Sequence, residues 1–189
     1  MPRLMVFNQV SLDGYFTDRN GDMSWAHKDD PEWTAFASEN AKGGGGSGGV
    51  LLFGRKTYEM MASFWPTKAA LEQMPAVAKG MNDMQKIVFS RTLDKVTWQN
   101  TKLVKGDLVA EVGKMKKAPG ADMVILGSGS IVSQLTQAGL IDEYQLVVDP
   151  VVLGEGRTLF EGVKDKVNLK RTNARTFGNG NVVLTYQRA

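Results

Sequence analysis

The 189-residue chain contains no cysteine and only one histidine. Without cysteine it can form neither disulfides nor thiolate metal sites, and it has no thiol nucleophile. A single histidine excludes multi-histidine zinc sites, and a Ser-His-Asp triad would depend wholly on His27. Chemistry must therefore come from carboxylates, hydroxyls, backbone groups or a bound cofactor, and we expect no metal site.

Long apolar runs are also missing. No segment approaches the ~20 apolar residues that cross a bilayer, and residues 1–10 lack the pattern of a signal peptide. The net charge of +3, from 23 Lys and Arg against 20 Asp and Glu, is too small for a dense nucleic-acid-binding face. We therefore expect a cytoplasmic protein that binds neither membranes nor nucleic acid.

A hydrophobic content of 42% supports one core, and the length suits a single α/β domain over residues 1–189. Apolar runs and helical patterns alternate, and two alternating strands surround a Gly-Asn-Gly turn near the end. We expect strands at 3–10, 15–17, 50–53, 86–89, 103–104, 123–126, 144–148, 169–176 and 181–188. Helices are expected from Pro31, after Gly54, at 75–84, from Asp107 to Lys117 and after Gly129. This order predicts a mainly parallel sheet, covered by helices on both faces, with an antiparallel C-terminal hairpin.

Residues 43–49 form a low-complexity run of six glycines and one serine. Such a run is too flexible for a helix or a stable strand. It is either a natural surface loop or an engineered linker that replaces one, and the sequence leaves both open. A tight loop is expected at residues 154–156.

Three predicted strands end in residues suited to phosphate. Gly54, Arg55 and Thr57 combine a close backbone turn, a guanidinium and a hydroxyl at a helix start, although an ordinary helix cap with a solvated arginine has the same residues. Ser90 and Arg91 again follow a buried strand. The third segment offers only small residues before a helix, namely Gly127, Ser128, Gly129 and Ser130.

The division of charge among these segments indicates the ligand. A glycine turn without charge suits a pyrophosphate, and two arginines suit an additional ribose phosphate, so the pattern favours NADPH over NADH. The full Rossmann fingerprint is absent, because Val132 stands where its third glycine would be. We expect a different α/β topology to bind the dinucleotide.

The same segments resemble a known family. Gly54-Arg55-Lys56-Thr57-Tyr58-Glu59, Ser90-Arg91 and Ile125-Leu126-Gly127-Ser128-Gly129 resemble the cofactor motifs of dihydrofolate reductases. Three further segments are more similar to the RibD C-terminal reductase branch: residues 11–14 (SLDG), 138–143 (AGLIDE) and 150–156 (PVVLGEG). The match covers nearly the whole chain in the right order.

The resemblance implies a dihydrofolate reductase-like three-layer α/β/α fold and NADPH bound across the carboxyl ends of the strands. Arg55, Thr57, Ser90 and Arg91 would then meet the adenosine-side phosphates, and residues 127–130 the pyrophosphate. Asp13 and Gly14 would lie near the nicotinamide. The resemblance also implies a homodimer, and it places Gly154 among the substrate contacts.

Candidate catalytic groups are carboxylates. Glu32 precedes Phe36 by one helical turn, a spacing that matches the family's acid and aromatic residue, and a carboxylate in an apolar cleft could relay a proton near neutrality. Asp30 and Asp13 are the other candidates, although Asp30 also suits a helix cap and Asp13 a turn. Asn8 could present its amide to a heterocycle. Trp25 could flank a planar ring.

The sequence thus predicts an NADPH-dependent reductase that transfers a hydride to a small pterin-like or pyrimidine-like heterocycle, or to a related C=N or C=O compound. A dinucleotide-binding protein of the same fold without catalysis is the alternative. A hydrolase using a serine and His27 is disfavoured, because the chain has no G-x-S-x-G elbow.

Overall fold

The computed structural model describes residues 1–26, 30–41 and 49–189. The candidate His27 and most of the glycine run, residues 43–48, lie outside them. None of the helices that the described residues form is both long and apolar enough to cross a membrane.

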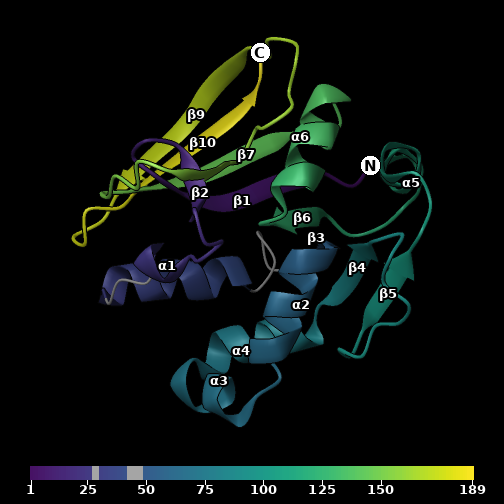
Figure 1. Cartoon of the computed structure of the whole chain (residues 1–189), viewed down its shortest axis with the longest axis horizontal. Helices are drawn as coiled ribbons and strands as arrows, with labels where there is room; N and C mark the ends of the chain where they lie inside the picture. The colour runs from purple at the N-terminus through teal and green to yellow at the C-terminus, as the bar shows by residue number, and fades with distance from the viewer. Residues whose placement is uncertain (27–29, 42–48) are drawn as a thin grey trace.

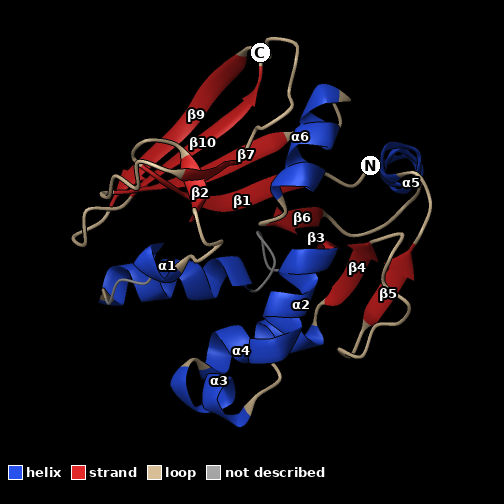
Figure 2. Ribbon diagram, viewed as in Figure 1, coloured by secondary structure: helices blue, strands red, loops and turns tan. Residues whose placement is uncertain are grey.

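An eight-stranded sheet runs through the molecule in the order β5-β4-β3-β6-β1-β7-β10-β9 (Figures 1 and 2). The six strands from β5 to β7 are parallel, and β10 and β9 continue the sheet antiparallel. The strands of this sheet are β1 (Leu4–Ser11), β3 (Val50–Gly54), β4 (Gln85–Phe89), β5 (Thr101–Val104), β6 (Met123–Leu126), β7 (Glu143–Asp149), β9 (Leu169–Thr176) and β10 (Val182–Arg188). A small second sheet pairs β2 (Tyr15–Asp18) with β8 (Gly156–Thr158).

Helices cover both faces of the large sheet. The helices are α1 (Pro31–Ala41), α2 (Arg55–Phe64), α3 (Lys68–Gln73), α4 (Pro75–Asp83), α5 (Leu108–Lys117) and α6 (Gly129–Gln137), with a short 3₁₀ turn at Ser24–Ala26. Buried side chains of α5 and α6 share one apolar cluster with Leu4, Val6 and Leu52. Those of α2 and α4 share another with Leu51 and Phe53, on the opposite face. The expected mixed sheet, helical layers and C-terminal hairpin are confirmed.

The apolar alternation of β1 explains why it lies at the centre. Leu4 and Val6 are fully buried on the α6 face, and Phe7 packs toward α1 on the other face. A strand that is apolar on both faces must be covered on both. Helices α6 and α1 cover these two faces, and β1 pairs with β6 along one edge and with β7 along the other.

Two elements differ from the sequence expectations. The tight loop expected at residues 154–156 ends in β8, because Gly156 pairs with Asp18. Helix α3 was not anticipated. It begins where the Thr67 hydroxyl accepts a hydrogen bond from the amide of Ala70.

Candidate functional site

The three segments with phosphate-binding residues lie side by side. They follow β4, β3 and β6, which are consecutive parallel strands of the sheet, so all three begin at the same edge. Open α/β sheets bind ligands at the carboxyl ends of their strands. This edge is therefore the candidate site.

Ser128 joins two of these segments. Its hydroxyl accepts a hydrogen bond from the amide of Gly54 (2.8 Å) and donates one to Oγ1 of Thr57 (2.8 Å). Its backbone is left-handed, with φ 60° and ψ 64°. A non-glycine residue in that region is strained, and such strain gathers at functional sites. The side chain of Ser128 thus fixes the start of α2 against the start of α6.

The glycines of this edge are explained by packing within the protein. A Cβ on Gly129 would lie 2.9 Å from Cε1 of Phe16, and one on Gly54 would lie 3.3 Å from the Ser128 hydroxyl. Gly127 has φ +63°, and its Cβ would lie 3.0 Å from Cγ2 of Thr57. The glycines allow the loops to approach one another, and their expected role of leaving room for a phosphate stays a prediction.

The start of α6 can accept an anion. The amides of Ile131 and Val132 both donate to the carbonyl of Ser128. The preceding amides, those of Gly129 and Ser130, have no acceptor inside the helix. Together with the helix dipole these amides favour a negative group, and Ser130 is exposed.

Arg55 connects the segments that follow β3 and β4. Its guanidinium contacts the carboxylate of Glu59 (2.8 Å) and the hydroxyl of Thr92 (3.0 Å), and 47% of its side chain is exposed. The Ser90 hydroxyl holds the second loop by accepting the amides of Thr92 and Leu93. Arg91 is exposed and forms no ion pair with any other described residue. The edge therefore carries one partly engaged and one free guanidinium.

Comparison with known proteins gives the family of this chain. The profile of the RibD C-terminal domain matches residues 2–183. The chain belongs to the RibD C-terminal domain family. The protein YyaP of Bacillus subtilis strain 168 is 33% identical over 185 residues, which cover 97% of this chain and 94% of YyaP. A second protein of that strain, YwjB, is 25% identical over 187 residues, with coverage of 99% and 98%.

Solved structures share the fold. A Shewanella sp. PV-4 protein provisionally assigned to riboflavin biosynthesis superposes with a TM-score of 0.74 at 24% identity, and 99% of each chain is covered. A pyrimidine reductase-like protein from Corynebacterium diphtheriae gives a TM-score of 0.63 at 12% identity, over 100% of this chain and 92% of the other. The Thermotoga maritima diaminohydroxyphosphoribosylaminopyrimidine deaminase/5-amino-6-(5-phosphoribosylamino)uracil reductase gives a TM-score of 0.65 at 13% identity, over 100% of this chain and 57% of the other. The expected dihydrofolate reductase-like fold is thereby confirmed, and the profile match confirms the expected membership of the RibD C-terminal family.

Within this RibD-type fold, Asp13 stabilises a turn. Its carboxylate accepts the Ser11 hydroxyl (2.6 Å) and the amides of Gly154 (2.7 Å) and Leu153 (3.1 Å). The hydrogen bond from Ser11 and those amides hold the pKa of Asp13 below its usual range, against a smaller effect of burial. Gly14 beside it has φ +88°, a conformation that suits glycine. Asp13 was expected near the nicotinamide and Gly154 at the substrate. In the structure the amide of Gly154 donates a hydrogen bond to the carboxylate of Asp13.

The two candidate acids near the start of α1 are engaged with protein groups. Glu32 pairs with Arg175 of β9 at 2.8 Å, and 56% of its side chain is exposed. Oδ1 of Asp30 accepts the amide of Trp33 at 2.7 Å, as an N-cap does. The expectation of a buried acid at Glu32 is wrong, because the helix turns its apolar residues Trp33 and Phe36 to the sheet and leaves Glu32 outside.

Asn8 and Trp25, the two other substrate candidates, differ in surroundings. Asn8 is only 3% exposed on β1, and neither atom of its amide bonds with a described residue. The indole of Trp25 donates to the carbonyl of Asp22 at 3.2 Å in the polar loop after β2. Their roles as substrate contacts stay predictions.

Two buried polar residues escaped sequence analysis. Asp149 ends β7 and Asn181 precedes β10, and both are fully buried. Asp149 is paired in register with Ser11 of β1, which is also buried. The only sequence signal was a polar residue at each end of an apolar strand, which is typical of ordinary turns.

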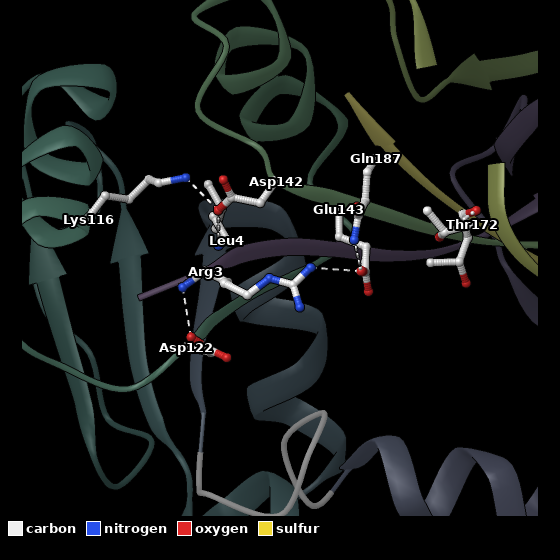
Figure 3. A network of polar contacts seen from close by, with 9 residues as sticks. Arg3, Leu4, Lys116, Asp122, Asp142, Glu143, Thr172 and Gln187 are labelled. Carbon is white, nitrogen blue, oxygen red and sulfur yellow. Dashed lines mark hydrogen bonds and ion pairs between the residues drawn. The ribbon is translucent and has the colours of Figure 1, made fainter. Parts of the chain in front are cut away.

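The opposite edge of the sheet is closed by internal pairs (Figure 3). Asp142 accepts the amide of Leu4 (2.7 Å) and the ammonium of Lys116, and Arg3 pairs with Glu143 (2.9 Å). A hollow of about 720 Å³ lies there, lined in part by Arg3, Lys116 and Asp142. Because these three are already engaged with protein partners, we place no ligand in it.

Proposed function

We propose that this protein is an NADPH-dependent reductase of a small planar heterocycle, pterin-like or pyrimidine-like. The observation that carries the proposal is the joining of β3 and β6 ends through Ser128, which brings the start of α2 and the start of α6 to one edge of the sheet. Membership of the RibD C-terminal family supports a reductase of this kind.

The donors at this edge fit a phosphorylated dinucleotide. The amides at the start of α6 would hold the pyrophosphate, because they lack acceptors inside the helix. Arg91 and Arg55 would bind the additional ribose phosphate, for which a guanidinium offers paired donors. When bound, the cofactor supplies the hydride, and the chain supplies orientation.

A dinucleotide-binding protein without catalysis is the second candidate. It is favoured by the state of the three expected acids, since Asp13 is held by two amides, Asp30 caps α1 and Glu32 pairs with Arg175. Under that alternative the protein binds NADPH as tightly, but it does not oxidise NADPH when any of the heterocycles is added.

Two measurements separate these candidates. Calorimetric titration with NADPH and NADH tests the cofactor, and NADPH oxidation over a panel of pterins and aminopyrimidines tests catalysis. We expect NADPH to bind at least about tenfold more tightly than NADH, a difference of ~1.4 kcal/mol. Binding of neither would refute both candidates, and tight binding without turnover would leave the non-catalytic one.

We also propose a homodimer, on the resemblance to RibD-type reductases. Light scattering on the purified protein tests it, against a monomer mass of 20.7 kDa.

A further inference from the structure

The strands β7, β10 and β9 leave an apolar surface open on the α6 side of the sheet. Residues paired in register across antiparallel strands share a face, and Tyr144 assigns that face to α6, because its hydroxyl bonds Oγ1 of Thr136 at 3.1 Å. In Figure 2, α6 covers the central strands, whereas β10 and β9 extend beyond it with no helix in front of them. This outer face consists of Leu146, Val182, Leu184, Tyr186 and Ala174, with Arg171 at its margin.

The two sides of β10 are covered to different extents. Val183 and Thr185, on the α1 side, are buried, whereas Val182, Leu184 and Tyr186 on the outer face are only half-buried. Val182 and Leu184 belong to none of the apolar clusters that the described residues form. An antiparallel sheet with one face in water normally carries polar side chains on that face, but here the open face is apolar. Such a surface is typical of a site where a partner packs.

The free edge of the sheet is less suited to a partner than this face. β9 is the last strand, and all 8 of its residues are exposed. It carries Lys170, Arg171 and Arg175 and no acidic residue. Like charges on paired strands repel, and a cationic edge is a common protection against strand pairing. A second copy of the chain would therefore pack on the outer face and not along the edge.

Opposite charges stand at the two margins of the outer face. Arg171 lies at the β9 margin, where it is paired in register with Tyr186. Glu161 lies at the β7 margin, because the ring of the preceding Phe160 packs against Tyr144 with 6.1 Å between the ring centroids. Both charged residues are exposed, and neither forms an ion pair with any other described residue. A surface with an unpaired cation on one side and an unpaired anion on the other is complementary to a copy of itself.

We propose that the outer face is a dimer interface, on which a second copy of this chain packs face to face about a two-fold axis running along β10. Rotation about this axis places β9 of each copy over β7 of the other. Arg171 then meets Glu161 of the partner subunit, and the contact occurs twice because the interface is isologous. Leu184 and Tyr186 lie at the centre, where buried apolar and aromatic side chains contribute most to affinity. The assignment rests on the proposed homodimer and does not depend on catalysis.

Charge reversal tests the predicted contact. The variants are Arg171→Glu, Glu161→Arg and the double variant that carries both, and Leu184→Asp tests the apolar centre. The matched control is Lys170→Glu, because Lys170 is exposed on the same strand but points to the opposite face. Sedimentation equilibrium measures the Kd of the dimer, whose mass should be twice the 20.7 kDa of the monomer. Circular dichroism checks that each variant is folded.

We expect the unmodified protein and Lys170→Glu to form dimers whose Kd values agree within about threefold. Arg171→Glu and Glu161→Arg should each raise the Kd at least about tenfold, because each brings like charges together twice in the interface. The double variant restores opposite charges, so its Kd should return to within about threefold of the unmodified value. Leu184→Asp should raise the Kd at least about 100-fold, because it places a carboxylate in the apolar centre.

A dimer whose Kd is unchanged by the charge reversals, or a double variant that associates no more tightly than the single ones, would overturn the assignment and leave the homodimer intact. A monomeric unmodified protein would refute the homodimer and this interface together, and the outer face would then serve a different partner. The charge reversals alter exposed side chains, so they decide the question even where Leu184→Asp unfolds the chain. Failure of the reductase proposal is distinct, since it appears as absence of NADPH binding by the unmodified protein.

Discussion

Lys86 places an ammonium group inside an apolar cluster. It is 1% exposed, donates to the carbonyls of Met81, Asn82 and Met84 at 2.6–3.1 Å, and lies 4.4 Å from the ring centroid of Trp98. These carbonyls lie at the end of α4, where helical acceptors lack partners. The side chain therefore closes that helix from within the core.

Titration of Lys86 should be visible in the stability of the protein. Burial lowers its pKa to about 8 from a usual value of 10.5. Between these two values the unfolded chain binds more protons than the folded one, so this group's contribution to stability rises with pH over that window and is constant below it. The rise amounts to at most ~3 kcal/mol.

Urea unfolding of the unmodified protein and Lys86→Met between pH 7 and pH 10.5 measures this rise. The variant removes the titrating group, so the difference in unfolding free energy between the two proteins should move in favour of the unmodified one as the pH increases. A difference that is constant over the window would contradict the account.

The hydroxyl of Ser128 is the second test at this scale. Its removal in Ser128→Ala leaves the half-buried amide of Gly54 without an acceptor, which should cost about 1–3 kcal/mol of stability. Ser130→Ala, on an exposed side chain two residues away, is the control and should change stability by less than about 0.5 kcal/mol. Equal effects of the two substitutions in chemical denaturation would argue against the Ser128 bridge.

At the scale of elements, caps recognised in the sequence had clear structural counterparts. Asp107 accepts the amide of Ala110 at 2.8 Å at the start of α5. Asp107→Ala should cost about 1 kcal/mol. The matched control is Asp94→Ala, because Asp94 is exposed and forms no hydrogen bond with the described residues. Thermal unfolding measures both, and equal changes in Tm would show that the cap contributes nothing.

The strands and most helices could be predicted because apolar periodicity is local. Four consecutive apolar residues at 123–126 already specify a strand covered on both faces, and Asp30-Pro31 already specifies a helix start. Helix α3 and β8 were missed for a physical reason. Both are short, and β8 exists through pairing with β2, more than a hundred residues away.

The candidate site was predictable only in part. Segments that follow parallel strands meet at one edge whenever the strands are neighbours, so the convergence of residues 54–57, 90–92 and 127–130 follows from the fold class. The surroundings of Glu32 did not follow, because its partner Arg175 lies on a strand 143 residues away. Asn181 and Asp149 could not be recognised before the register of β7 and β10 was known.

At the scale of the whole molecule, the order of strands creates the candidate site. The chain leaves β1, forms β3, β4 and β5 outward, and returns to insert β6 between β3 and β1. Neighbouring connections thus leave the sheet in different directions, α2 and α4 on one face and α5 and α6 on the other. Ligands bind where such connections diverge, and in this molecule that is the edge bearing Gly54, Ser128 and Arg55.

The affinity of Arg55→Ala for NADPH and NADH tests this account most directly, with Lys56→Ala as the control for loss of a positive charge on the same helix. Arg55 reaches Thr92 of the neighbouring loop, whereas Lys56 is simply exposed. We predict that Arg55→Ala weakens NADPH binding about tenfold or more and NADH binding less than about twofold, and that Lys56→Ala changes neither beyond about twofold. Equal losses for the two cofactors in Arg55→Ala, or no loss for either, would contradict the account.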